Sequence, residues 1–172
     1  MKPWGVSLMI GVVFFSGWVA EVQADQRIQW SDYTDEAWKI RFLMPEGMEL
    51  EEKEAFEWRE LKGITEDQAV EIVVQSVPDR HPLEEIEEYA LKELGVAKKQ
   101  LIAAEKGVRH SLEFRTYTLK LELDGESYRF AIFAARHVER SFSYLIYITI
   151  REALYQEFTE EFHFWLKNFY GL

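Results

Sequence analysis

The sequence contains no cysteine. This absence excludes a disulfide framework, a thiol nucleophile and a lipid-modified cysteine of the bacterial lipoprotein type. The fold must therefore be held together by its hydrophobic core.

The sequence also lacks the short motifs of familiar catalytic sites. It has no Gly-x-Ser-x-Gly elbow, no His-Glu-x-x-His pair, no glycine-rich phosphate loop and no aspartate-rich calcium loop. We therefore expect a non-catalytic protein that needs no cofactor. An enzyme with a convergent site remains a third hypothesis, because the four histidines and many carboxylates can meet in space.

Basic residues are few: 20 lysines and arginines face 31 acidic residues, which gives a formal charge of −11. A field of that sign repels polyphosphate backbones and anionic lipid surfaces, so we expect no nucleic-acid partner. Linkers rich in proline, glycine and serine are missing, as are repeats of a fixed period. After removal of the leader described next, we expect residues 25–172 to form a single α+β domain.

The one long uncharged stretch lies at the start, where "MKPWGVSLMIGVVFFSGWVAEVQADQ" has the layout of a secretory signal peptide. Val22 and Ala24 occupy the two positions at which a signal peptidase needs small side chains. We expect cleavage after Ala24 and a periplasmic or extracellular protein with no membrane span. The alternative is an uncleaved anchor, because about 17 uncharged residues reach the lower limit for crossing a bilayer.

Three segments alternate in polarity or are apolar throughout, namely residues 38–45, 55–61 and 69–77. With short turns between them they predict an antiparallel meander. Residues 81–95 then predict a helix, with Pro82 in the first turn, glutamates facing water and Gly95 at the end. The stretch 97–107 stays open between helix and edge strand.

The clearest structural signal is the hairpin "RTYTLKLELDGESYRFAIFAA" around a type I′ turn at Asp124 and Gly125. This turn pairs Leu121 with Tyr128, Leu119 with Phe130 and Tyr117 with Ile132. Every pair is apolar, so register and burial agree.

The same register, carried to the open end of the hairpin, sets Glu113 opposite Arg136 and Arg109 opposite Arg140. It gathers a candidate basic cluster: Arg109, His110, Arg136, His137 and Arg140. Arginine forks bind carboxylates and phosphates through two hydrogen bonds, so this cluster is a candidate site for an anionic ligand or an acidic partner loop. The alternative is a Glu113–Arg136 ion pair among solvated charges at the rim.

After a strand over residues 141–150, the chain closes with "EFTEEFHFWLKNFYGL". Helical spacing places Leu154, Phe158, Phe162, Trp165 and Phe169 on one stripe that would pack on a sheet. Phe164 and Tyr170 fall outside the stripe, so they either pack under a loop or form a docking patch. His163 follows Glu160 by three residues, but one such pair supplies only two ligands, and we expect no metal site.

The order of these elements resembles the PsbP/Mog1 superfamily. The resemblance covers most of residues 30–170 and rests on "YTDEAWKIRFLMPEGMEL", the helix opening "HPLEEIEEYA", the long hairpin, the strand ending "YITI" and the closing "EFTEEFHFWLKNF". Met48 departs from the pattern, since an aromatic residue is expected after "PEG". The resemblance implies an α/β/α sandwich around an antiparallel sheet.

The same resemblance implies a non-catalytic binding or assembly role, as in extrinsic photosystem II subunits, a Ran-binding nuclear import factor and exported bacterial proteins. It assigns no site residue to this chain. The first functional hypothesis is therefore an exported domain that binds or helps to assemble a protein complex in the periplasm or at the membrane. The alternative is a carrier of a small apolar ligand or lipid, since aromatic residues around a curved sheet can enclose a cavity.

Overall fold

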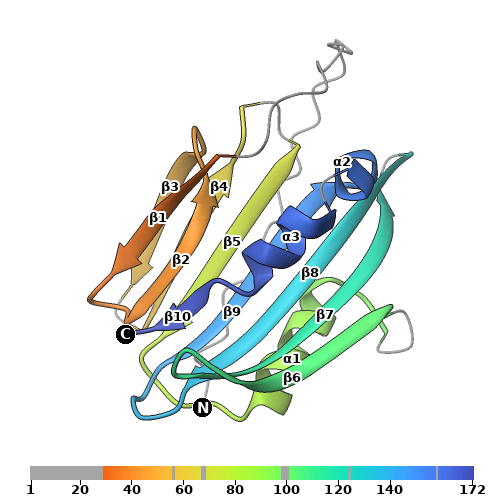
Figure 1. Cartoon of the computed structure of the whole chain (residues 1–172). Coiled ribbons are helices and arrows are strands. Elements are labelled where there is room, and N and C mark those ends of the chain that lie inside the picture. Colours follow the sequence, from red (N-terminus) through yellow and green to blue (C-terminus); the bar gives the residue numbers. More distant parts are fainter. Residues whose placement is uncertain (1–28, 56, 67–68, 98–100, 124, 158) are drawn as a thin grey trace.

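The computed structural model describes residues 29–172 except 56, 67–68, 98–100, 124 and 158 (Figure 1). The expected signal peptide lies outside the described residues. The elements in chain order are β1 Trp30–Asp35, β2 Ile40–Pro45, β3 Glu49–Ala55, β4 Trp58–Ile64, β5 Val70–Val77, α1 Leu83–Glu93, β6 Ala103–Arg109, β7 Leu112–Leu123, β8 Glu126–His137, β9 Ser143–Arg151, α2 Glu152–Glu157, α3 Thr159–Leu166 and β10 Phe169–Gly171.

Seven antiparallel strands form the main sheet in the order β3-β4-β5-β9-β8-β7-β6. The hairpin register predicted from the sequence is confirmed along β7 and β8: Tyr117 faces Ile132 and Glu113 faces Arg136. Gly125 has a φ of 85°, which glycine adopts without steric cost in a tight turn. Asp124, the other predicted turn residue, lies outside the described residues.

A second sheet of three strands, β1-β2-β10, lies over one face of the main sheet (Figure 1). The predicted meander is therefore wrong in its first member, because β2 pairs with β1 and β10 instead of with β4. Alternating polarity shows that a strand is half-buried but does not identify the sheet it joins. The predicted antiparallel pairing of the second member with the third is confirmed as β4 with β5. The bounds of the second member are wrong, since β3 ends at Ala55 and β4 begins at Trp58, which divides the strand predicted over 55–61.

Two hydrophobic clusters fill the two faces of the main sheet. On one face, α1 packs through Ile86 and Ala90 against β7, β8 and β9. On the other face, the small sheet and α3 cover side chains such as Phe133 and Ile146. The predicted α/β/α sandwich is thus correct only in part, because a sheet shares the second outer layer with the C-terminal helices.

The predicted helix over 81–95 is confirmed as α1, and Gly95 follows it with a φ of 64°. One of its glutamates contradicts the prediction that all face water: Glu87 is 2% exposed. The carboxylate of Glu87 accepts hydrogen bonds from Arg115 at 3.0 Å and from the hydroxyl of Tyr117. The ambiguous stretch 97–107 contributes the edge strand β6.

The C-terminal segment does not form the single helix that its apolar spacing predicted. It forms α2, α3 and then β10, which pairs Phe169 with Phe42. The predicted stripe residues Phe162, Trp165 and Phe169 are buried as expected, while Phe158 lies outside the described residues. Pairing with β2 overrides the helical period because it satisfies the backbone of β10 through a strand more than a hundred residues away.

Candidate functional site

The structure divides the predicted basic cluster between the two faces of the main sheet. Arg136 and His137 are consecutive on β8, so their side chains leave the strand on opposite faces. Arg136 lies on the α1 face, where its guanidinium forms an ion pair with Glu113 at 2.6 Å, as the register predicted. His137 lies on the face covered by the small sheet. The five basic residues therefore do not form one surface.

The predicted pairing of Arg109 with Arg140 is wrong. A tight turn at His110 and Ser111, with φ values of 51° and 62°, ends the β7–β8 hairpin and folds β6 back, so Arg109 faces Leu112. Two successive residues with positive φ are typical of a type I′ turn. Sequence reasoning missed it because neither position carries glycine.

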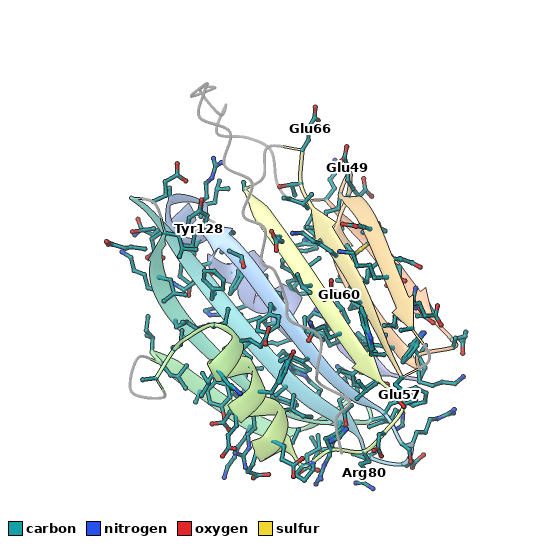
Figure 2. All side chains as sticks on the ribbon, turned by 180° about the vertical axis from the view of Figure 1, so that it is seen from behind. Glu49, Glu57, Glu60, Glu66, Arg80 and Tyr128 are labelled. Carbon is teal, nitrogen blue, oxygen red and sulfur yellow. The ribbon has the colours of Figure 1, made fainter. Side chains whose placement is uncertain are left out.

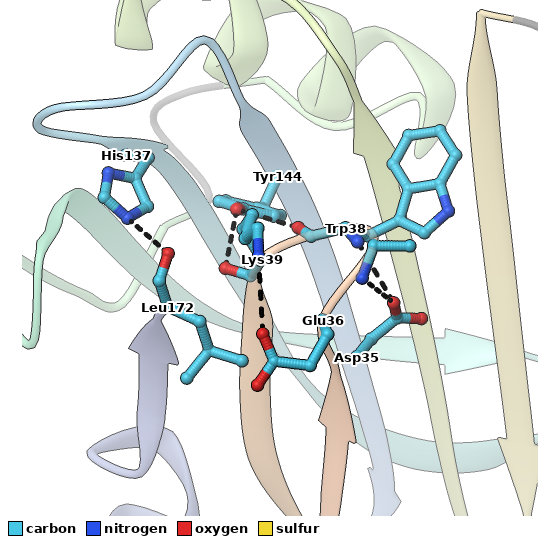
Figure 3. A network of polar contacts seen from close by, with 8 residues as sticks. Asp35, Glu36, Trp38, Lys39, His137, Tyr144 and Leu172 are labelled. Carbon is cyan, nitrogen blue, oxygen red and sulfur yellow. Dashed lines mark hydrogen bonds and ion pairs between the residues drawn. The ribbon is translucent and has the colours of Figure 1, made fainter.

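His137 fixes the end of β10 through both ring nitrogens. Its side chain is 2% exposed, and Nδ1 accepts the backbone N–H groups of Glu139 at 3.1 Å and Arg140 at 3.2 Å. The proton of the neutral ring is therefore on Nε2, which donates to the carbonyl of Leu172 at 3.2 Å (Figure 3). Burial lowers the pKa of His137, and the charge of Arg140 lowers it further.

The backbone next to His137 is equally constrained. The N–H of Gly171 donates to the carbonyl of His110 at 2.8 Å, and the N–H of Leu172 donates to the carbonyl of Lys39 at 3.0 Å. A Cβ atom on Gly171 would come within 2.8 Å of the His137 ring, so only glycine fits there. Tyr144 completes this network, because its hydroxyl lies 2.9 Å from the carbonyl oxygen of Lys39 (Figure 3).

Two further predicted basic residues on this side, Arg109 and His110, also have partners within the chain. Arg109 donates to the carbonyl of Leu166 at 3.2 Å and lies 4.7 Å from the centre of the Phe114 ring. His110 stacks on Tyr170 with ring centres 4.0 Å apart, and desolvation together with the charge of Arg109 lowers its pKa. Arg140 is exposed in the β8–β9 loop. The stack of His110 on Tyr170 holds β10 against the main sheet. An anion-binding role for these residues stays a prediction.

The two predicted aromatic docking residues lie apart. Phe164 is 49% exposed on α3, with its ring centre 6.4 Å from that of Trp30. Tyr170 lies on β10, half-buried, and its hydroxyl donates to Asn168 at 2.9 Å. Phe164 is therefore the more accessible of the two.

Sequence reasoning missed a polar cluster on the α1 face, at the boundary between α1 and the strands beyond it. We call it the Tyr147 cluster; its members are Glu60 on β4, Gln75 on β5, Tyr147 on β9, and Tyr89 and Glu93 on α1. Figure 2 looks onto this face, with α1 over one half and Glu60 on the strands beyond the helix. The Gln75 amide donates to Glu60 Oε2 at 3.0 Å.

Both carboxylates act on the same phenols. Burial raises the pKa of Tyr147, and the negative charges of Glu93 and Glu60 raise it further. Burial, followed by the charge of Glu93 and a hydrogen bond to it, raises the pKa of Tyr89 to about 12. Within the described part of the chain, no basic side chain forms an ion pair with Glu60 or Glu93.

Only the helical half of this cluster had a signal in the sequence. Tyr89 and Glu93 are four residues apart on α1 and share one face of the helix. The approach of that face to Glu60 and Tyr147 depends on the position of α1 on the sheet, which no local pattern specifies.

Among the residues that the structure describes, no three side chains of the metal-ligating types histidine, cysteine, aspartate and glutamate lie together, and no helix is long and apolar enough to span a membrane.

No family model matches the sequence, and the search of curated proteins found no relative. Solved structures do match. The solution structure of cyanobacterial PsbP (CyanoP) from Synechocystis sp. PCC 6803 has a TM-score of 0.61 and 11% identity, covering 91% of this chain and 98% of that chain. The fold is PsbP/Mog1-like. The crystal structure of the Ran-binding protein Mog1p from Saccharomyces cerevisiae agrees, with a TM-score of 0.54 and 11% identity, covering 84% of this chain and 96% of that chain.

Proposed function

We propose that the protein is an exported, non-catalytic domain that binds a protein of the cell envelope or helps to assemble a complex there. The N-terminal sequence supports export, because residues 1–24 have the layout of a signal peptide. The fold supports a binding role by analogy, since Mog1p, which shares it, is a Ran-binding protein.

The observation that carries the proposal is the acidic half of the α1 face, across β3, β4 and β5. On this face lie four glutamates, Glu49 and Glu51 of the exposed strand β3, Glu60 of β4 and Glu71 of β5, against two lysines, Lys53 and Lys62. The Tyr147 cluster borders the same half through Glu60 and Gln75. A partner with a positively charged surface would be attracted and oriented by this face.

A photo-crosslinking amino acid at Glu51 tests the proposal in the native cells. Glu51 is exposed and lies on the acidic half, whereas the control position Lys120 is exposed on the opposite face of the sheet, on β7. We expect a discrete cross-linked protein of the envelope from position 51 and none from position 120. No adduct at 51, or the same adducts at both positions, would contradict the proposal.

Mass spectrometry of the same material also tests the alternative function predicted from the sequence. An apolar ligand carrier would retain a small-molecule adduct in place of a cross-linked protein. The described residues give no observation that favours this alternative, because the side chains on both faces of the main sheet belong to packed hydrophobic clusters.

A further inference from the structure

The Tyr147 cluster contains hydrogen-bonding capacity that the chain itself does not use. Tyr147 is 5% exposed and Gln75 is 8% exposed. Among the described residues, neither the Tyr147 hydroxyl nor Oε1 of Gln75 has a hydrogen-bond partner. Buried polar groups are nearly always paired, and each that is not costs stability. Two such groups beside two carboxylates therefore indicate a missing partner.

The chemistry of the cluster specifies a cation. Glu60 lies opposite Gln75 and accepts its amide at 3.0 Å, and Tyr147 is the diagonal neighbour of Gln75 on the next strand. The negative charges of Glu60 and Glu93 both act on the Tyr147 hydroxyl. The two lysines beside Glu60 on this face, Lys53 opposite it on β3 and Lys62 on β4, are already paired with Glu51 and Glu71, each at 3.4 Å. A cation from outside the described chain would satisfy the carboxylates and give the oxygens of Gln75 and Tyr147 a donor.

The number and spread of the acceptors favour a guanidinium over an ammonium. The acceptors of the cluster are two carboxylates, one amide oxygen and one phenol oxygen, and they come from four elements, β4, β5, β9 and α1. Guanidinium offers five donors in a planar fork and stacks on aromatic rings such as that of Tyr89, whereas ammonium offers three donors from one point.

We propose that the Tyr147 cluster binds an arginine side chain of the protein partner. Tyr89 and Glu93, which are half-buried on the flank of α1, rotate to admit the guanidinium between Glu93 and Glu60. Such rotamer changes are common when proteins bind. This inference rests on the proposed function, because the arginine belongs to the protein partner proposed there. It identifies the side chain of the partner that the acidic face recognises.

Titration of the purified protein with the peptide acetyl-Gly-Gly-Arg-Gly-Gly-amide, followed by NMR at the Gln75 side-chain amide and the Tyr147 ring, tests the site directly. The same peptide with citrulline in place of arginine is the neutral control, and the lysine peptide tests the preference for guanidinium. We expect saturable shifts with arginine and at least ten-fold weaker binding of the other two peptides. No saturable shift, or equal binding of citrulline or lysine, would overturn the proposal.

Three variants separate a specific site from the general acidity of the protein. Glu60→Gln and Glu93→Gln should each weaken arginine binding at least five-fold. Glu54→Gln removes the same charge from an exposed position on the opposite face of the sheet, on β3, and should leave binding unchanged. An equal loss in all three variants would overturn the proposal, because it would show attraction by net charge alone.

Tyr147→Phe provides a readout that a purely structural tyrosine would not give. Because the hydroxyl is buried and unpaired, its removal should raise the denaturant midpoint of the free protein while it weakens arginine binding. A lower midpoint, or unchanged binding, would contradict the role of the hydroxyl as an unused acceptor.

The peptide experiment and the crosslinking experiment fail independently. Arginine binding without a captured partner would leave the site in place and remove the proposed function. A cross-linked partner without saturable NMR shifts from the arginine peptide would support the proposed function and contradict the arginine site.

Discussion

His137 holds β10 in place only while its ring is neutral. Nδ1 must be unprotonated to accept the N–H groups of Glu139 and Arg140, and the Nε2 proton is used for the carbonyl of Leu172. Protonation of Nδ1 would set a positive ring against two N–H donors and leave a buried charge. A residue predicted to bind an anion is thus a structural element of the native state.

We expect this histidine to make the protein less stable in mild acid. Its folded-state pKa is lowered by burial and by the charges of Arg140 and Arg80, so the unfolded chain binds the proton more tightly. Its contribution is complete above the unfolded pKa of about 6.5 and is lost as the pH falls toward the lower folded pKa. Urea unfolding between pH 7.5 and 5.5 measures the effect.

The matched variant is His137→Asn, in which the amide oxygen replaces Nδ1 as the acceptor. The variant should be less stable at pH 7.5 and should lose less stability on acidification than the wild type. The variant should still lose a little stability as the pH falls, because the pKa of His110 is also lowered. Parallel pH profiles for the two proteins would show that His137 does not titrate in this range.

At the scale of elements, the turn between β6 and β7 decides where Arg109 lies. Its two central residues, His110 and Ser111, both have positive φ, and neither is glycine. For residues with a Cβ atom, this conformation costs about 1–2 kcal/mol each. Two interactions offset this cost: the turn allows β6 to pair with β7, and the carbonyl of His110 accepts the N–H of Gly171.

Replacing Ser111 by glycine should therefore stabilise the protein by about 1 kcal/mol, since glycine adopts positive φ without the steric penalty. The denaturant midpoint in urea is the measurement. Ser141→Gly is the matched control: Ser141 is exposed but does not have positive φ, so glycine should be neutral or destabilising there. Equal effects at the two positions would contradict the explanation.

The helix α1 depends on a buried ion pair with the sheet. Glu87 is 2% exposed, while the side chain of Arg115, its partner, is 26% exposed. Arg115→Ala would leave the carboxylate buried without its counter-charge, and we expect a loss of about 2–3 kcal/mol from the free energy of unfolding. Addition of Glu87→Gln should recover part of that loss, because an amide needs no counter-charge.

Arg41→Ala is the control for this prediction. The Arg41–Asp32 pair is about half-exposed on both sides, and exposed pairs contribute about 0–1 kcal/mol. Urea unfolding of the three variants measures the differences. A similar loss for Arg41→Ala and Arg115→Ala would show that burial of Glu87 is not the cause.

At the scale of the whole molecule, the acidic face and the export signal belong to one proposal. The formal charge of −11 is not spread evenly, because β3 concentrates four exposed glutamates at one edge of the main sheet. Charged side chains on an edge strand also discourage pairing with other sheets. The arrangement therefore suits a protein that meets its partner through side chains rather than by adding a strand.

The mass of the protein from its native cells tests the export proposal. We expect a chain that begins at Asp25 and is recovered from the envelope or the medium, because signal peptidase would cut after Ala24. Ala24→Arg should block the cut and leave the full chain attached to the membrane. An intact chain in the cytoplasm would contradict export.

Local patterns were sufficient to predict α1 and the β7–β8 hairpin. In α1, the spacing of Leu83, Ile86 and Ala90 lies within one helix, and Gly95 stands two residues after its last residue. In the hairpin, a two-residue turn and alternating side chains set the register of every pair out to Leu112 and His137. Contacts between residues close in sequence carry this information, so it is present in the sequence itself.

Only the tertiary structure decided the rest. The small sheet brings Phe169 beside Phe42, the pleat of β8 separates Arg136 from His137, and the packing of α1 brings Tyr89 and Glu93 to Glu60 and Tyr147. The sequence by itself determined the charge and the local elements, and it predicts the export signal. The sheet that each strand joins and the face that each side chain occupies depend on long-range packing, which no short stretch of sequence encodes.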